Sequence, residues 1–273
     1  MEPDVNYGYA SINSLSRAIF NISYIQNNSD ISFYKMAVLA YISKEYLISE
    51  LIDKIYNIPY LFDLYLYSSV QINTEDFLPH FKNNSKINSF EIKIIVNKEN
   101  VLLTYLIDFK RKSKNYKYIC NLNFAKYKNI TYFEEWKNYL LNNLLGNSKI
   151  ISEIISDFEK NSELGLIFPE KYFKSQIQFN DFINNSDIKY INYILRRIYS
   201  KHLKIDITSI FIDFPEGNMF WAKVSAIYPI LNLYSYTGFT RKFKLIIYNN
   251  LEKIWIFLIK FNGFFYRKIF KHL

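Results

Sequence analysis

Short apolar runs alternate with helical hydrophobic spacing from residue 35 onward, and this pattern predicts the elements of the fold. The run KMAVLAYI at 35–42 is typical of a buried strand, and KEYLISELIDKIYN at 44–57 repeats apolar residues at helical spacing. Pro59 then ends that helix, because proline cannot continue it. A second strand is expected at 62–69.

The same alternation continues along the chain and indicates the fold class. We expect Thr74 and Ser148 to cap two of the helices. Strands separated by helices predict an α/β fold with a mostly parallel sheet flanked by helices. The further strands are expected at 90–96, 116–124, 164–169 and 209–214, and the further helices at 73–83, 100–112, 132–146, 148–161, 187–202 and 222–233.

Composition narrows the class of protein. With 273 residues, half of them apolar and 19% aromatic, the chain can bury a large core, which excludes wholesale disorder. A lone cysteine, Cys120, excludes an internal disulfide and favours a reducing compartment. No apolar stretch approaches the ~18 residues of a spanning helix, and the start lacks a secretory pattern. We therefore expect a cytoplasmic protein.

The net charge of +9 is concentrated at the C-terminal end. Residues 241–273 hold eight Lys or Arg and one Glu, which leaves only about +2 for the rest, so nucleic-acid binding is not expected. Because this segment also contains Trp255 and several Phe, we expect a basic amphipathic helical tail on the inner face of the cytoplasmic membrane. A helix packed on the domain is the alternative. The predicted organisation is an extension at 1–34, an α/β domain at 35–240 and this tail.

Candidate site residues follow from position, because ligands of parallel α/β sheets bind beyond the carboxyl ends of the strands. Asp213 and Glu216 flank Pro215 there and are the expected catalytic pair, one as base and one as electrostatic stabiliser. The alternative is a surface turn in which Asp213 caps a helix. The other polar residues at strand ends are Asn97, Lys98, Glu99, Asn123, Lys126, Lys128 and Asn218.

Several of these residues have a plain structural alternative. Lys126 and Lys128 have charges suited to a diphosphate, but they also fit a solvated loop. Phe220 and Trp221 more often fill a core than contact a sugar. Glycine-rich phosphate loops, zinc-type His or Cys spacings and Asp-x-Asp pairs are absent from the sequence, so no metal ligand is assigned.

Four segments carry a resemblance to a known family over about residues 36–235. They are MAVLAYISKEYLISELIDKIYNIPYLFDLYLYSS, YKYICNLNFAKYKN with WKNYLLNNLLGN, SDFEKNSELGLIFPE, and FPEGNMFWAKVSAIYPILNL with its Gly-x-Met-Phe-Trp turn. In these segments the chain resembles the rhamnan synthesis F family, glycosyltransferase-like proteins of bacterial surface-polysaccharide assembly.

The resemblance implies a Rossmann-like, GT-A-like glycosyltransferase domain. It would transfer a sugar such as rhamnose from a nucleotide-sugar of the dTDP-rhamnose type to a lipid-linked glycan acceptor, with Mg²⁺ or Mn²⁺ as an open question. Gly217 would let the chain turn so that Asn218 faces a sugar, with Trp221 beside it as a further sugar-binding residue. The expected donor-binding residues are Asn97, Lys98, Asn123, Lys126 and Lys128.

The family motifs are only partly kept. The family's Asn-Arg-Gly-Arg-Asp stretch reads NKENV here, and its His-Thr-Lys reads NFAKYK. A catalytically degenerate relative that binds a glycan or a partner protein is therefore the alternative to a transferase.

Overall fold

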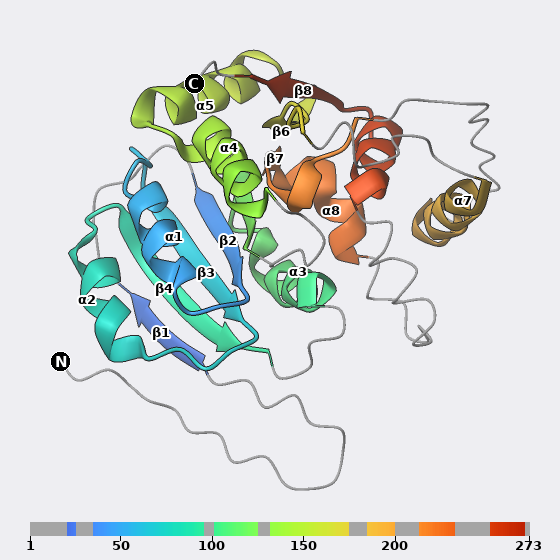
Figure 1. The fold of residues 1–273 in the computed structure, drawn as a ribbon. Coiled ribbons are helices and arrows are strands. Elements are labelled where there is room, and N and C mark those ends of the chain that lie inside the picture. The colour runs from blue at the N-terminus through green and yellow to red at the C-terminus, as the bar shows by residue number, and fades with distance from the viewer. Residues whose placement is uncertain are drawn as a thin grey trace, which may run out of the picture.

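A sheet with helices on both faces forms the body of the chain (Figure 1). A computed structural model describes residues 21–25, 35–95, 101–124, 132–174, 185–199, 213–232 and 252–270. The strands are β1 (Asn21–Ile25), β2 (Met36–Ile42), β3 (Phe62–Ser68), β4 (Ile87–Ile94), β5 (Tyr118–Phe124), β6 (Leu164–Pro169), β7 (Phe220–Lys223) and β8 (Phe265–Ile269).

The sheet is mostly parallel. Its eight described strands lie in the order β1-β4-β3-β2-β5-β7-β6-β8. Strands β4, β3, β2 and β5 pair in parallel, as do β6 and β8, whereas β1 and β7 run antiparallel to their neighbours. The predicted fold class, a Rossmann-like α/β sheet flanked by helices, is confirmed.

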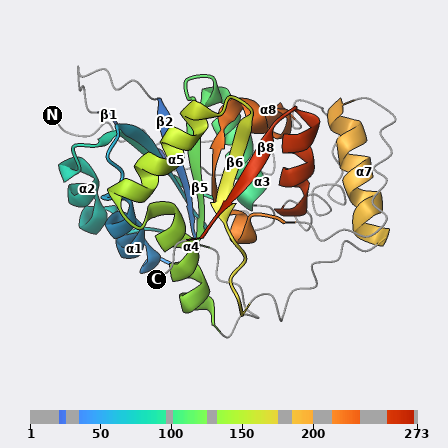
Figure 2. The same cartoon turned by 90° about the horizontal axis from the view of Figure 1, so that it is seen from above.

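Two layers of helices cover the two faces (Figure 2). Because side chains alternate along a strand, β2 sends Val38 and Ala40 into one core and Ala37 and Leu39 into the other. The first core is closed by α1 (Leu47–Ile55), α2 (Thr74–Asn83), α4 (Phe133–Leu145) and α5 (Ser148–Lys160). The second is closed by α3 (Val101–Ser113), α7 (Asn185–Tyr199), α8 (Val224–Asn232) and the helical residues 252–261.

The apolar pattern predicted the elements from β2 to β6, but the two expected helix caps are wrong. Thr74 and Ser148 are each the first helical residue, and the cap is the asparagine before it. Asn147 has extended backbone angles, and its side-chain Oδ1 accepts a hydrogen bond from the Ile150 backbone N–H at 3.0 Å. A cap residue must lie outside the helical region, which explains the shift by one position.

The segment around residue 220 differs from the prediction. Residues 222 and 223, expected to open a helix, belong to the short strand β7, which inserts between β5 and β6. All four β7 residues are buried, so the strand shows no alternation that a pattern could reveal. Of the strand expected at 209–214, residues 209–212 lie outside the described part, and Asp213 and Phe214 are irregular.

The C-terminal segment is built into the domain where the structure describes it. The expected helix is present at 252–261, and its residues Ile254 to Ile259 are buried in the second core. The helix is followed by β8, an unexpected strand that pairs with β6. Strand β1, within the expected N-terminal extension, likewise joins the sheet. The rest of both terminal segments lies outside the described residues.

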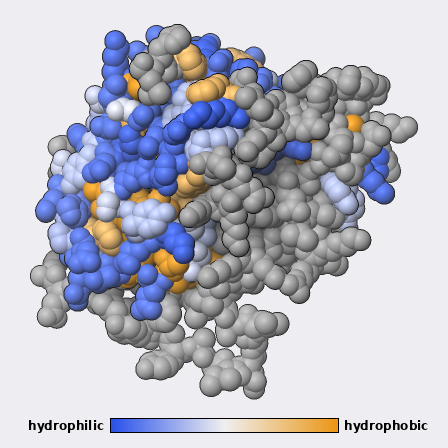
Figure 3. All heavy atoms as spheres, in the orientation of Figure 1, coloured by the Kyte–Doolittle hydropathy of each residue, from blue (hydrophilic) through white to orange (hydrophobic). Residues whose placement is uncertain are grey.

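Surface and core properties fit a helix-covered sheet. On the face drawn in Figure 3, hydrophilic residues cover most of the described surface at the left, with small apolar areas between them. The described helices include none with the length and apolar character needed to cross a bilayer.

Cys120 is fully buried, and burial raises the pKa of its thiol. Cys120 is therefore a packing residue of the core.

Candidate functional site

The candidate site is the turn formed by residues 213–219, which leads into β7. Strand β7 runs antiparallel to β5 and β6, with Phe220 opposite Asn121 in the middle of β5 and Trp221 opposite Ile167 of β6, so the residues before Phe220 run toward the carboxyl ends of both strands. The turn therefore lies at the carboxyl edge of the sheet, the edge at which α/β proteins bind ligands. This is the region that the sequence singled out.

The turn needs its glycine. The backbone φ angles of Gly217 and Asn218 are 63° and 56°, a left-handed conformation that glycine adopts freely and asparagine tolerates. A Cβ atom on Gly217 would lie 2.7 Å from Cη2 of Trp136. The left-handed backbone and the nearby Trp136 ring together restrict position 217 to glycine. The sharp turn expected here is present.

Two buried asparagines of β5 hold the backbone of the turn. The Asn121 side-chain Nδ2 donates to the carbonyl oxygen of Asn218 at 2.6 Å, and the Asn123 Nδ2 donates to that of Gly217 at 2.9 Å. Tyr105 of α3 donates to Oδ1 of Asn121 at 3.1 Å. Asn123, expected to bind the donor, thus uses its amide within the protein, and the sequence analysis did not identify Asn121.

The side chains of Asn218 and Trp221 point to other parts of the domain. Oδ1 of Asn218 accepts from the indole N–H of Trp255 at 2.9 Å, and its Nδ2 donates to Glu252 at 3.3 Å. Trp221 is fully buried and donates to the carbonyl oxygen of Leu144 at 3.1 Å. The structure therefore places Trp221 in the core, because no part of its ring is left for a sugar to stack on.

Glu216 is a buried carboxylate that ties three elements together. It is only 5% exposed, and its Oε2 accepts from the indole N–H of Trp136 at 2.9 Å and from the backbone N–H of Tyr172 at 3.4 Å. These contacts join the turn to α4 and to the segment after β6. Such a carboxylate fixes geometry and has little access to a substrate.

Asp213 is the accessible carboxylate of the pair. Its side chain is 40% exposed, and it accepts from Lys268 Nζ at 3.0 Å and from the Tyr266 hydroxyl at 3.1 Å. Burial raises the pKa of Tyr266 to about 12, with Asp213 adding to the effect, so the phenol stays a donor. The alternative in which Asp213 caps a helix is wrong, since Pro215 is the residue before the short helix at 216–218.

Lys171, which was not among the expected site residues, is a half-buried cation near these two carboxylates. Lys171 follows β6, and burial lowers its pKa, while Glu216, Asp213 and Glu252 act in the opposite direction and favour the charged ammonium. Its position two residues after Pro169, where β6 ends, was the available signal. Its Nζ is buried, so Lys171 can act on a phosphate group as a nearby positive charge.

Aromatic hydroxyls border the same region. The Tyr172 ring lies 5.7 Å from that of Tyr132 and 5.2 Å from that of Tyr139. The hydroxyls of Tyr132 and Tyr139 are buried and have no hydrogen-bond partner among the described residues. Burial raises the pKa of Tyr139 to about 12, with Glu170 and Glu216 contributing, so the group remains protonated. Both hydroxyls can donate to a polar guest.

Four predicted donor residues, Asn97, Lys98, Lys126 and Lys128, lie outside the described part, as does Glu99. The structure thus brings together Asp213, Glu216, Gly217, Asn218 and Asn123. Across the described ranges, no three side chains of His, Cys, Asp or Glu gather in a way that could hold a metal ion.

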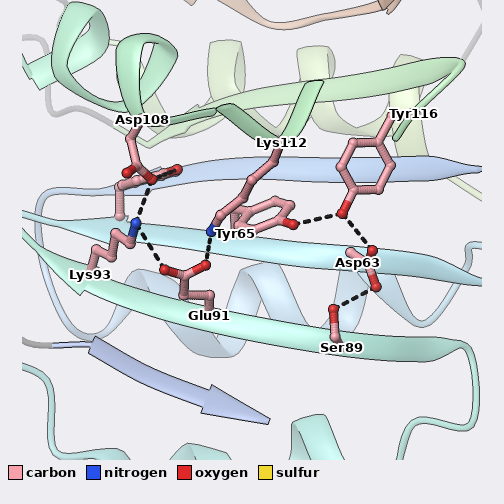
Figure 4. Close-up of polar contacts among 9 residues, drawn as sticks. Asp63, Tyr65, Ser89, Glu91, Lys93, Asp108, Lys112 and Tyr116 are labelled. Atoms are coloured by element: carbon pink, nitrogen blue, oxygen red, sulfur yellow. Dashed lines mark hydrogen bonds and ion pairs between the residues drawn. The ribbon is translucent and has the colours of Figure 1, made fainter. Parts of the chain in front are cut away.

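A separate polar network lies beneath α3 (Figure 4). Pairing of β3 with β4 sets Asp63, Tyr65 and Tyr67 beside Ser89, Glu91 and Lys93 on one face of the sheet. Lys93 Nζ lies 2.8 Å from Glu91 and 2.6 Å from Asp108 of α3, and Lys112 of α3 also pairs with Glu91.

The polar groups of this network form hydrogen bonds with one another. The Tyr116 hydroxyl donates to Asp63 at 2.5 Å and lies 2.6 Å from that of Tyr65, and burial together with the bond to Asp63 raises the pKa of Tyr116. Ser89 donates to the other oxygen of Asp63 at 2.6 Å. Since each charged group shown has a partner, we assign this cluster to fixing α3 on the sheet.

The chain also matches a family of known proteins. A family model described as Rhamnan synthesis protein F matches residues 9–261, which is most of the chain. No curated protein matches the chain.

Proposed function

The chain belongs to the rhamnan synthesis protein F family of cell-surface polysaccharide biosynthesis, and on that premise we propose that it is a glycosyltransferase. It transfers a sugar such as rhamnose from a nucleotide-sugar of the dTDP-rhamnose type to a glycan acceptor. The observation that carries the proposal is Asp213, an accessible carboxylate that Lys268 and Tyr266 hold at the carboxyl edge of the sheet.

The proposed reaction assigns a separate task to each charge. An acceptor hydroxyl attacks the anomeric carbon of the donor, and Asp213 takes the proton of that hydroxyl. The new C–O bond forms as the bond between the anomeric carbon and the diphosphate oxygen breaks. The nucleoside diphosphate leaves with the electron pair, and Lys171 lies where its charge opposes the negative charge that develops.

Exposure distinguishes the two carboxylates. Glu216 is buried and accepts hydrogen bonds from Trp136 and Tyr172, so we propose that it is a positioning residue. Asp213 has solvent access, and Lys268 and Tyr266 orient it. A base must reach the proton that it removes, which favours Asp213 for that role.

We also propose that the protein works in the cytoplasm, at the inner face of the cytoplasmic membrane. The support is the charge of residues 241–273, eight Lys or Arg against one Glu, because basic segments are attracted to anionic lipid surfaces. Lys260 and Phe261 within this segment are exposed. A lipid-linked acceptor would be presented at the same surface.

A second candidate function is binding without catalysis, with a glycan or a partner protein as ligand. It is favoured by the altered stretch NKENV and by the use of Asn123 inside the protein. Donor binding without turnover is the expected result for such a relative.

The direct test is a transfer assay with the full chain, dTDP-rhamnose and a lipid-linked glycan acceptor. We expect release of dTDP that depends on the acceptor, together with an acceptor product heavier by one deoxyhexose. Donor binding with no product in the presence of acceptor would favour the non-catalytic alternative.

A further inference from the structure

We propose that the pocket between α5 and β8 binds one neutral pyranose unit of the acceptor polysaccharide. The inference rests on the proposed function, because it identifies where the acceptor of that reaction is held. None of the residues that line the pocket is among the site residues expected from the sequence.

The pocket has one wall from each element. Its volume is about 280 Å³, close to the lower end of the ~300–1,000 Å³ typical of small-molecule sites, and this suits a single ring. Helix α5 contributes Ile150, Glu153, Ile154 and Asp157, one to two turns apart on the same side of the helix. Arg267 of β8 forms an ion pair with Asp157, which fixes the helix against the strand.

The second wall is the end of β8. Lys268, Ile269 and Phe270 line it, and Phe270 is 48% exposed. The pocket thus combines an apolar surface with carboxylates. A sugar ring has matching faces, since its C–H groups pack on apolar and aromatic side chains, while its hydroxyls donate to carboxylates.

The cations at the pocket are already paired with carboxylates. Arg267 pairs with Asp157, and Lys268 pairs with Asp213. A diphosphate would have to break one of these pairs, whereas a neutral glycan leaves both in place. The lining therefore suits a neutral acceptor better than the nucleotide-sugar donor.

The pocket lies across the edge strand β8 from Asp213. Arg267 pairs with Asp157 of α5 and Ile269 packs on the first core, whereas Tyr266 and Lys268 extend to the other face of β8 and contact Asp213. The Glu170 backbone N–H donates to the carbonyl oxygen of Ile269 at 2.8 Å, and Tyr172, two residues further on, contacts Glu216. A glycan seated at Phe270 would therefore be separated from Asp213 by the strand, so we assign the pocket to an acceptor unit remote from the reacting hydroxyl.

The test is titration calorimetry of the full chain with a rhamnose-containing tetrasaccharide, using Phe270→Ala and Glu153→Gln. We expect each change to weaken binding by about 3–10-fold, since loss of an aromatic contact or of a charged acceptor has that size. Tyr46→Ala, which removes a 60% exposed ring at the start of α1, is the matched control and should leave affinity unchanged.

The outcomes separate this inference from the proposed function. Unchanged tetrasaccharide affinity in both pocket variants, or no binding by the wild-type chain, would overturn the pocket assignment. A dTDP titration of the same samples tests the donor site independently, and we expect it to be unaffected by either change. Glu153→Gln is nearly isosteric, so it keeps the test decisive should Phe270→Ala impair folding.

Discussion

Replacing Asp213 with asparagine is expected to lower the turnover of the transfer reaction by about 10²–10⁴-fold, the usual contribution of a general base. Lys268 and Tyr266 donate to different oxygens of Asp213, so asparagine, with one acceptor oxygen, can keep one of the two hydrogen bonds. Donor affinity should stay within about twofold of the wild-type value, because the amide removes proton acceptance and not binding. Steady-state kinetics with separate donor and acceptor titrations measure both quantities.

The matched control is Glu216→Gln. The glutamine carbonyl can still accept from Trp136 and Tyr172, so we expect a smaller loss of turnover than at Asp213. The assignment of roles is contradicted if Glu216→Gln abolishes transfer and Asp213→Asn leaves it intact.

Gly217→Ala is expected to reduce the free energy of unfolding by about 2–5 kcal/mol. A left-handed backbone costs a residue with a Cβ roughly 1–2 kcal/mol, and overpacking a core adds about 1–3 kcal/mol. The second contribution applies because the new Cβ would lie 2.7 Å from Cη2 of Trp136. That ring cannot easily move away, since its N–H is bonded to the buried Glu216. Denaturant unfolding followed by tryptophan fluorescence measures the loss.

Gly263→Ala is the comparison that isolates the steric part. Gly263 also has a positive φ, 77°, but a Cβ there meets no atom within 4 Å. We expect this change to cost only the backbone part, about 1–2 kcal/mol. Equal losses for the two variants would show that contact with Trp136 contributes nothing.

The sequence was informative wherever a local pattern carried the structure. Strands such as β2 and β3 could be predicted because each is an apolar run bounded by polar residues and a proline or helix signal. Strand β7 could not, because its four residues are all buried, and β8 could not, because it mixes Arg267 and Lys268 with aromatic residues at a sheet edge. Both strands are defined by their partners in the sheet.

The candidate site was predictable in place but not in detail. Rules of strand topology directed attention to Asp213 and Glu216, yet only packing shows which of the two is buried. The bonds from Asn121 and Asn123 to the turn span more than ninety residues of sequence, a separation at which no local pattern reveals a partner. Lys171 was missed for the same reason, since its carboxylate neighbours come from distant segments.

The most direct test of the central claim is titration calorimetry of the full chain with dTDP, UDP and GDP, with and without Mn²⁺. We expect that one nucleotide binds with a micromolar Kd and that Lys171→Met weakens this binding by about tenfold, through loss of one positive charge near the diphosphate. Failure of all three nucleotides to bind would contradict a donor site at the carboxyl edge, and would identify the chain as a glycan-binding or partner-binding relative.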